Sequence, residues 1–383
     1  MTSPGPLDDL LIVDLSRVLA GPYATMVLSD LGARVVKVER PGTGDDSRHI
    51  GPFRDGQSAY FASINRGKQS IALDLGVAAD RAVFEALLVR ADVLVENFRP
   101  GVMDKLGFGW AALHARYPRL IYAAASGFGH TGPDRAKPAY DMIVQALGGV
   151  MSVTGWPGGP PTRVGTSIGD ITAGLFTVIG ILSALHHRER NGEGLFVDVA
   201  MLDGQIAILE NAVARFAVSG VAPGPLGARH PSITPFAAYA CEGGHIVIAA
   251  GNDMLFQTLV RALNLGTLVD DPRFLTNALR TDHADALAAI FEARLADAPA
   301  AHWLALLDAA AIPCAPLNDV AQALRHPQVV ARNMAITTAF PDGTPLLAAG
   351  NPVKLSGYAD PAVRAKAPGL DEHRAMILSD LGL

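Results

Sequence analysis

The sequence predicts an α/β fold with a parallel, doubly wound sheet, because strand and helix signals alternate along its N-terminal third. Short apolar runs typical of buried strands occupy residues 10–14, 34–39, 70–74, 93–96 and 120–124. Helical stretches separate several of them, at residues 22–31, 78–90 and 102–108. Ligands in such sheets bind beyond the carboxyl ends of the strands, so a site is expected there.

A second, smaller region is expected because 383 residues exceed one domain of ordinary size. A Pro/Gly-rich stretch at 220–227 precedes two strand-like runs around Glu242-Gly243-Gly244, which indicate a hairpin. Helical segments follow at 253–263, 283–295 and 300–310, and residues 313–316 resemble a linker. The last part has short strand-like pieces and a terminal helix near 372–381.

Composition excludes several classes of partner. The net charge of −6 argues against a nucleic-acid-binding protein. Cys241 and Cys314 are far apart and, like the histidines, show no metal-ligand spacing, so we expect no metal and a cytoplasmic protein with reduced thiols. The longest apolar run, residues 171–185, is shorter than the ~20 residues that cross a bilayer, and it predicts a buried helix rather than a membrane span.

Asp170 is the strongest candidate for chemistry. It follows Gly169 and precedes an apolar helix expected at 171–187. At such a junction, main-chain N–H groups and the positive helix end favour an ionised carboxylate, which can act as a nucleophile. The alternative is structural, since aspartate is a common N-cap and Asp170 would then only begin the helix.

A dinucleotide site is the first alternative function. A strand, a helix and a second strand ending in Glu39 resemble a nicotinamide-binding unit. However, the turn at residues 16–22 has one glycine where three are needed, and Pro22 removes an N–H donor. A serine hydrolase is also disfavoured, because the chain has no Gly-x-Ser-x-Gly elbow.

With these features in order, the sequence resembles the class III coenzyme A transferases over nearly its whole length. The resemblance rests on the shared order of several motifs, at residues 13–22, 36–45, 65–68, 95–101, 138–141, 169–170 and 192–199. It implies an interlocked homodimer with a large Rossmann-like domain and a smaller α+β domain. On that plan the large CoA-binding domain comprises residues 1–211 and 325–383, the small domain 227–312, and the linkers 212–226 and 313–324.

The resemblance also implies a mechanism. Asp170 would attack the donor thioester, forming an aspartyl anhydride and then an aspartyl–CoA thioester, with main-chain N–H groups near Gly169 approaching the developing oxyanion. No permanent cofactor is implied, since CoA and acyl-CoA are substrates. Asp141 matches a position where some relatives carry glutamate near the nucleophile, and a cap of the following helix is an equal alternative.

CoA contacts of the family map onto matching motifs here. They imply Ala20, Arg40, Leu73, Asn97 and Phe98 as binding residues. Lys105 replaces an arginine found in some relatives, Lys137 lies one position from a family lysine, and we add Arg17 after the first strand. Arg and Lys supply charge-assisted bonds to phosphate. For Arg40 and Lys105 the alternative is a solvated surface charge.

Substrate choice is narrowed by departures from formyl-CoA transferase. Leu19 replaces a glutamine, and the tetraglycine loop is absent from residues 227–236, which disfavours formate–oxalate exchange. A short dicarboxylate acceptor with succinyl-CoA as donor is expected instead. Its far carboxylate is expected to bind Arg229, with His230 and Tyr140 nearby, or Arg17. For Arg229 a structural ion pair is an equal alternative.

Two other functions stay open. An acyl-CoA racemase or epimerase of the same superfamily needs a histidine before the Asp141 position, where this chain has Ala139-Tyr140. A catalytically silent CoA-binding protein is the other, and an intact Asp170 argues against it.

Overall fold

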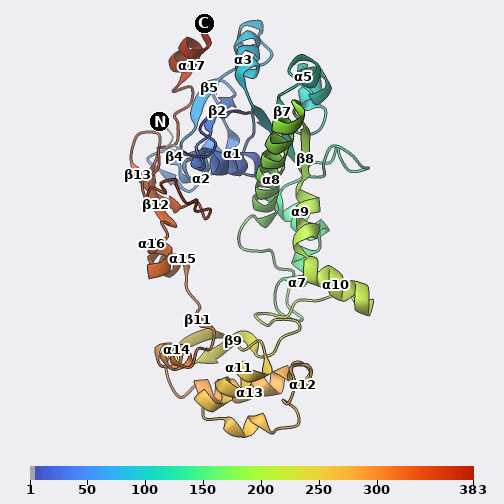
Figure 1. Ribbon diagram of the computed structural model, residues 1–383, viewed down its shortest axis with the longest axis vertical. Helices are drawn as coiled ribbons and strands as arrows, with labels where there is room; N and C mark the ends of the chain where they lie inside the picture. Colours follow the sequence, from blue (N-terminus) through green and yellow to red (C-terminus); the bar gives the residue numbers. More distant parts are fainter. Residues whose placement is uncertain (1–4) are drawn as a thin grey trace. The chain divides into compact units, whose positions relative to one another are not determined.

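The computed structural model describes residues 5–383, which form two compact units (Figure 1). Unit 1 contains residues 5–151, Arg163–Val221 and Leu324–Leu383. Unit 2 contains Ser152–Thr162 and Ala222–Ala323. Each unit has its own hydrophobic core.

Unit 1 is built on a six-stranded parallel sheet in the order β5-β2-β1-β6-β7-β8, which confirms the predicted α/β class. The strands are β1 (Leu11–Asp14), β2 (Arg34–Glu39), β5 (Gln69–Ala72), β6 (Val93–Glu96), β7 (Ile121–Ser126) and β8 (Phe196–Ala200). β2 and β6 have the predicted bounds. β8 was not predicted as a strand, because polar Asp198 interrupts its apolar run.

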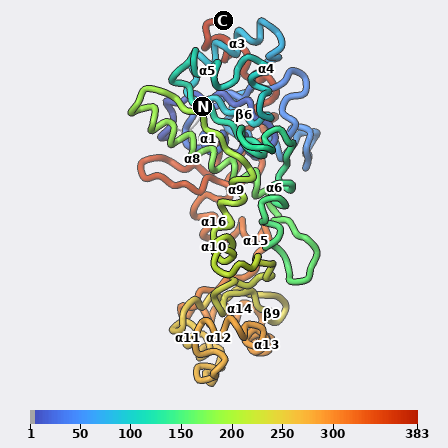
Figure 2. The backbone as a smooth tube through the Cα atoms, turned by 90° about the vertical axis from the view of Figure 1, so that its right-hand side faces the viewer, coloured from blue at the N-terminus to red at the C-terminus, as the bar shows by residue number. Residues whose placement is uncertain are grey.

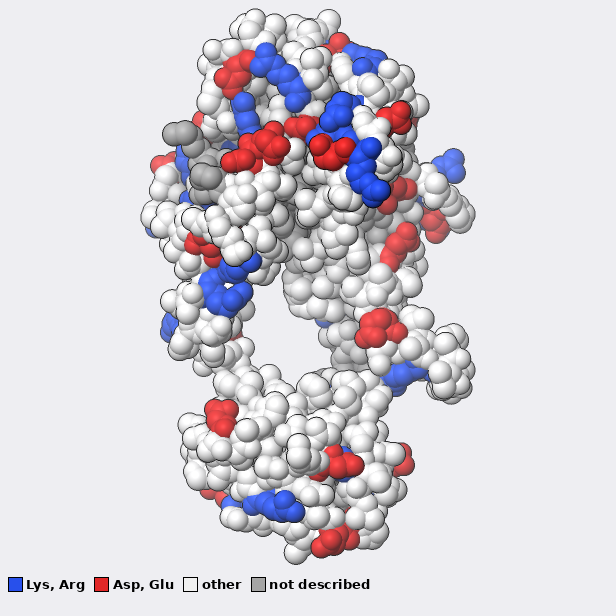
Figure 3. Space-filling model, in the orientation of Figure 1, with Lys and Arg blue, Asp and Glu red and all other residues white. Residues whose placement is uncertain are grey.

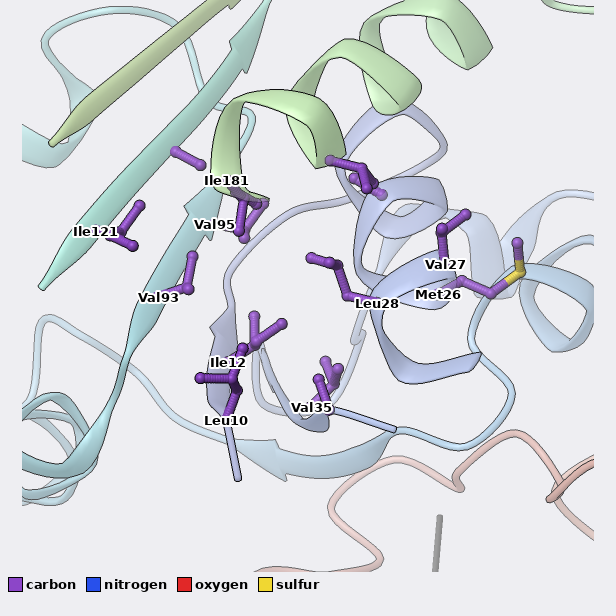
Figure 4. Close-up of a cluster of buried hydrophobic side chains, with 14 of the residues drawn as sticks. Leu10, Ile12, Met26, Val27, Leu28, Val35, Val93, Val95, Ile121 and Ile181 are labelled. Atoms are coloured by element: carbon purple, nitrogen blue, oxygen red, sulfur yellow. The ribbon is translucent and has the colours of Figure 1, made fainter. Parts of the chain in front are cut away.

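Helices cover both faces of this sheet, as successive strand residues point to opposite sides. Ile12 packs on one face with Leu28 and Ile181 (Figure 4), whereas Val13 packs on the other with Phe84. The first face carries α1 (Ala20–Asp30) and α8 (Ile168–Asn191). The second carries α3 (Ala78–Arg90), α4 (Val102–Leu106), α5 (Trp110–Arg116) and α17 (Arg374–Leu381). The sheet is therefore doubly wound.

The strand order reverses direction between β1 and β6, which is the topological switch point where such sheets bind ligands. The loops that follow these two strands are hydrogen-bonded to each other. The Arg17 N–H donates to Asn97 Oδ1 at 2.8 Å, and Asn97 Nδ2 donates to the Arg17 carbonyl at 2.7 Å.

Helix α8 is longer than predicted, with 24 residues that begin at Ile168 and end before Gly192. Within the described residues it is the one helix long and apolar enough to cross a membrane by length and composition. The prediction that this segment is too short to cross a bilayer was therefore wrong. Its small residues Ala173, Gly174 and Ala184 are buried, and it lies beside α1 (Figure 2). We therefore interpret α8 as a core helix.

The remaining elements of unit 1 surround this sheet. They are β3 (Phe53–Arg54), β4 (Gln57–Ser58), α2 (Ala59–Ile64), α6 (Asp141–Leu147), α9 (Met201–Ile208), α10 (Glu210–Ser219), α16 (Pro327–Ala331), the antiparallel pair β12 (Ala335–Ala339) and β13 (Pro345–Ala349), and a 3-10 turn at Asp46–His49. Two short helices lie at the unit boundaries, α7 (Val150–Val153) and α15 (Val320–Arg325).

Unit 2 packs helices against a three-stranded antiparallel sheet in the order β11-β10-β9. The predicted hairpin and helices are present, as β9 (Phe236–Cys241), β10 (Gly244–Ala249), α11 (Asp253–Ala262), α13 (Ala284–Leu295) and α14 (Ala300–Ala309). The unit also contains β11 (Cys314–Pro316), α12 (Asn277–Asp282) and a 3-10 turn at Gly266–Val269. Trp303 is fully buried in its core, and its indole N–H donates to the Leu295 carbonyl at 2.8 Å.

The structure divides the chain differently from the sequence prediction at three places. Residues 313–316 are not a linker, because Cys314–Pro316 forms β11 at the sheet edge, where proline is tolerated. The expected linker 212–226 is largely helix α10. Residues 152–162 belong to unit 2, since the Gly227 N–H donates to the Gly155 carbonyl and the Trp156 ring lies against Gly227.

Candidate active site

Asp170 lies where the N-terminal ends of two helices meet. It is the third residue of α8, after an N-cap at Ser167, so the structural alternative that Asp170 only caps the helix is wrong. The main-chain N–H of Ala20, the first residue of α1, faces the Asp170 carboxylate and favours its negative charge. The positive ends of both helix dipoles therefore face this carboxylate.

Burial nevertheless works against ionisation of Asp170. Loss of solvent raises its pKa to about 7, the negative charge of Asp141 acts in the same direction, and the Ala20 N–H opposes them. The sequence expectation of a carboxylate that simply stays ionised is thus corrected: near neutral pH, Asp170 is divided between its two protonation states. Its ionised form lacks a full hydration shell, which favours attack on an electrophile.

Asp141 connects helix α6 to the first turn of α8. It is the first residue of α6, whose N-cap is Tyr140. Its Oδ1 accepts the Gly169 N–H at 2.8 Å, and its Oδ2 accepts from Gln145 Nε2 at 2.8 Å. Asp141 therefore satisfies a donor of the neighbouring helix α8 rather than capping its own helix.

Gly169 allows this close approach. A Cβ atom at position 169 would lie 2.7 Å from Val144 Cγ2, so α6 could not pack as it does against a larger residue. The Gly169 N–H, which we expected near a developing oxyanion, is instead engaged by Asp141. The donor that faces the Asp170 carboxylate is the Ala20 N–H.

Tyr60 is a site residue that the sequence did not reveal. It lies on α2, half-buried, and the charges of Asp170, Asp45 and Asp141 together with burial raise its pKa to about 12. Its hydroxyl therefore stays protonated and can donate a hydrogen bond near Asp170. No motif or spacing marks Tyr60, because only the folded chain brings α2 to α8.

A pocket of about 540 Å³ lies at the carboxyl ends of β1, β2, β5 and β6. It brings together four of the predicted CoA contacts, Arg17, Arg40, Leu73 and Phe98. Arg99 also lines it, a residue of the motif at 95–101 to which we assigned no role. Arg40 is exposed, and among residues 5–383 its guanidinium has no side-chain partner. A pocket with three arginines and an aromatic ring suits a ligand with phosphates and a base.

The other predicted CoA contacts have different surroundings. The side chain of Asn97 is occupied by the main chain of Arg17. Lys105 lies on α4, two of whose other residues, Val102 and Leu106, line the pocket. Lys137 is exposed and forms an ion pair with Asp134 at 2.9 Å, and it does not line the pocket. Ala20 lies beside Asp170, at the far end of the loop that begins at the pocket.

The predicted acceptor residues are separated between the units. Tyr140 belongs to unit 1 and is 76% exposed. Arg229 and His230 belong to unit 2, where Arg229 pairs with Asp285 at 2.6 Å and His230 stacks on Phe236. Their roles stay predictions. In the part of the chain that the structure describes, no group of His, Cys, Asp and Glu side chains is arranged to hold a metal ion.

Comparisons with known proteins identify the family of this chain. The model of CoA-transferase family III matches residues 7–374. The chain is 50% identical to the acetyl-CoA:oxalate CoA-transferase of Acetobacter aceti, over 97% of this chain and 95% of that one. It is 40% identical to the succinyl-CoA:mesaconate CoA-transferase of Haloarcula hispanica, over 99% and 97%. A crystal structure of a CAIB/BAIF family protein from Brucella suis superposes with a TM-score of 0.87 at 39% identity, covering 98% and 99%.

The raised pKa of Asp170 predicts a pH-dependent gain in stability for Asp170→Asn. The folded-state pKa of about 7 exceeds the ordinary value of 3.8, so the native carboxylate destabilises the fold increasingly as pH rises to about 7. We expect Asp170→Asn to increase the free energy of unfolding at pH 8 by on the order of 1–3 kcal/mol, after allowance for partial solvent screening. The gain should be smaller at pH 5, and urea denaturation at both pH values measures it.

The control is Asp203→Asn, because Asp203 also lies in the first turn of a helix but is exposed. Its unfolding free energy should differ from that of the native protein by the same small amount at both pH values. An equal gain for Asp170→Asn at pH 5 and pH 8 would show that the pKa of Asp170 is not raised.

Proposed function

Because the chain belongs to CoA-transferase family III and is a CoA-transferase, with acyl-CoA as a substrate, we propose that Asp170 carries the covalent intermediates of CoA transfer to a short dicarboxylic acid. The observation that supports this best is the half-buried Asp170 carboxylate, which lies between two helix N-termini and is faced by the Ala20 N–H. Arg17 lines the pocket and Ala20 follows three residues later, so one loop connects the pocket to the carboxylate.

The first half of the reaction exchanges the donor acid for CoA. The ionised Asp170 oxygen attacks the thioester carbonyl of the donor, and the carbon–sulfur bond breaks to release CoA thiolate and leave a mixed anhydride. The thiolate then attacks the Asp170 carbonyl carbon of that anhydride. The donor acid leaves as its carboxylate, and Asp170 is left as a CoA thioester.

The second half repeats these steps in reverse. The acceptor carboxylate attacks the aspartyl thioester, forming a second anhydride and releasing the thiolate. The thiolate attacks the acceptor carbonyl, which yields the new acyl-CoA and restores the Asp170 carboxylate. No proton is consumed overall, so the enzyme needs a stabilised oxyanion and exclusion of water rather than a general base.

Dicarboxylate acceptors are supported by the names of the two relatives, whose acids, oxalate and mesaconate, each carry two carboxyl groups. Their donors are acetyl-CoA and succinyl-CoA. Within unit 2, Arg229 lines a pocket of about 230 Å³ with Trp156 and Phe236. Its partner Asp285 is 96% exposed, so this ion pair is weak and a ligand carboxylate can replace it.

A homodimer is supported by apolar side chains on three successive helices. Exposed residues of this kind are Leu175, Ile179 and Leu182 on α8, Ile206 on α9, and Val213 and Phe216 on α10. Figure 3 shows charged side chains gathered toward the C-terminal end of α8, whereas the surface over its middle turns is uncharged. Extended apolar surface of this kind is typical of a protein–protein interface.

The nucleophile is tested by Asp170→Ala, which we expect to abolish CoA transfer while CoA binding and the fold are retained. Asp170→Asn and Asp170→Ser should also be inactive, because neither supplies a carboxylate that can form the anhydride. Transfer is followed by chromatography of the acyl-CoA products, and hydroxylamine traps the acyl-enzyme of the native protein as an aspartyl hydroxamate.

Asp203→Ala is the matched control and should retain normal transfer, since it removes an exposed first-turn aspartate of another helix. Substantial turnover by Asp170→Ala would contradict the assignment. If the native protein binds CoA but hydroxylamine yields no modified Asp170, the silent CoA-binding alternative is favoured.

Arg40 is expected to bind a phosphate of CoA. Arg40→Ala removes one charge-assisted hydrogen bond, so CoA affinity should fall by on the order of 1.5–3 kcal/mol, with the main kinetic effect on the KM for acyl-CoA. Calorimetric titration of CoA measures the change. Arg54→Ala, an exposed arginine that does not line the pocket, should leave the affinity unchanged. Unchanged affinity for Arg40→Ala would make Arg40 a surface charge.

Arg229 is expected to bind the distal carboxylate of the acceptor. Arg229→Ala should therefore impair glutarate as acceptor at least tenfold more than pentanoate, an acid of the same length with one carboxylate, because about 1.4 kcal/mol of binding corresponds to tenfold. Asp285→Ala breaks the same ion pair but keeps the arginine, so it should leave this ratio unchanged. Equal effects of Arg229→Ala on both acids would mean that Arg229 is structural.

A further inference from the structure

In the loop between β1 and α1, side chains bind five of the six main-chain polar groups of residues 16–18. The Ser16 N–H donates to Asp14 Oδ1 at 2.9 Å, and the Ser16 carbonyl accepts from Lys37 Nζ at 2.7 Å. Asn97 engages both the N–H and the carbonyl of Arg17. The loop is therefore fixed before it reaches Ala20.

Val18 is the strained residue of this loop. Its φ of 65° lies in the left-handed region, which a β-branched side chain rarely occupies. Backbone strain of this kind persists only where the surroundings determine the conformation, and it is concentrated at functional sites. Here the Val18 N–H donates to Asp45 Oδ1 at 3.0 Å, which fixes the left-handed turn.

Asp45 is itself held on several sides. Its Oδ2 forms an ion pair with Lys37 at 2.8 Å, and both side chains are completely buried. Its Oδ1 also accepts from the N–H and the hydroxyl of Ser47, and its own N–H donates to Glu39 Oε2. A buried carboxylate with this many partners cannot shift without leaving a charge or donor unsatisfied.

Beyond Leu19, the main-chain N–H of Ala20 faces the Asp170 carboxylate and favours its negative charge. Only Leu19 thus separates the strained, anchored Val18 from the donor at the reacting group. The geometry points to Asp45 as a positioning residue for CoA transfer: through the Val18 N–H it orients the Ala20 N–H toward Asp170. This inference rests on the proposed role of Asp170 as the nucleophile.

The orientation matters because the Asp170 carboxyl group changes its charge during transfer. One oxygen becomes part of the anhydride and later leaves, and each attack on the Asp170 carbonyl carbon forms an oxyanion. A donor held in place by the fold stabilises that charge without reorganising, whereas a mobile loop loses this advantage. Disordering the loop should therefore lower kcat more than it raises the KM for acyl-CoA.

Two charge-balanced double variants isolate the contact. Lys37→Met with Asp45→Asn removes the buried ion pair but keeps an oxygen for the Val18 N–H. Lys37→Met with Asp45→Ala removes the ion pair and that oxygen as well. Both lose the Lys37 bond to the Ser16 carbonyl, so any general loss of stability from the ion pair is common to the two proteins.

We expect the alanine double variant to have a kcat about tenfold below that of the asparagine double variant, as one lost hydrogen bond implies. Its KM for acyl-CoA should differ from that of the asparagine double variant by less than about threefold. The acid limb of its pH–kcat profile should move to higher pH, because a misplaced Ala20 N–H no longer favours the ionised carboxylate. Asp141 on α6 and Tyr60 on α2 also face Asp170, and both are unaltered in the two variants.

Equal kcat values and equal acid limbs for the two double variants would overturn the inference and leave Asp45 a residue of the fold alone. If the alanine variant does not fold, Asn97→Ala tests the same loop, since it removes both bonds to the Arg17 main chain and leaves the ion pair intact. A change confined to the KM for acyl-CoA in Asn97→Ala would contradict the inference, and a lower kcat with a shifted acid limb would support it.

Asp170→Ala is assayed beside these proteins to separate the two proposals. If Asp170→Ala turns over, the proposed nucleophile is wrong whatever the double variants do. If it is inactive and the double variants are equal, only the role of Asp45 is lost.

Discussion

The close crossing of α1 and α8 is the constraint on which the rest of the site depends. Gly174 makes it feasible, because a Cβ at that position would lie 2.8 Å from the Ala20 carbonyl oxygen. The crossing brings the N–H of Ala20, the first residue of α1, to face the carboxylate of Asp170 in the first turn of α8. A donor of one helix thus faces an acceptor of the other. Both helices pack against the same face of the sheet, and the core that includes Leu28 and Ile181 holds them in register. The site thus inherits its rigidity from the core.

Opposing electrostatic effects then set the reactivity of Asp170. Two helix ends and the Ala20 N–H favour its negative charge, whereas burial and the second carboxylate, Asp141, disfavour it. The result is a group that ionises near neutral pH but keeps little solvent. Asp141 can lie so close because its own oxygens are satisfied by the Gly169 N–H and Gln145. Hydrogen bonds to Asp141 therefore help to keep the two carboxylates close together.

Much of the fold and part of the site could be predicted from the sequence. Periodicity alone located β2, β6 and α3 to the residue, because each is a continuous run with clear stops. Arg17, Arg40 and Phe98 were placed at strand ends and do share one pocket. The start of α8 was missed because Ser167 and Asp170 are both common N-cap residues, and the prediction began the helix after the later one. Tyr60 and the bond from Gly169 to Asp141 were beyond prediction, since they depend on which helices pack together in the folded chain.

The loop after β1 explains how one short segment serves both binding and chemistry. Arg17 faces the pocket, Val18 turns the chain through a left-handed conformation, and Ala20 begins the helix at Asp170. A glycine at position 18 would adopt that turn without strain, but it would also permit many other conformations. Valine has few alternatives, and with Asp45 bound to its N–H it keeps the loop in one shape. The cost in backbone strain, on the order of 1–3 kcal/mol, is offset by the buried network around Lys37 and Asp45. Removal of that network would free the loop that places Arg17 at the pocket and Ala20 at Asp170.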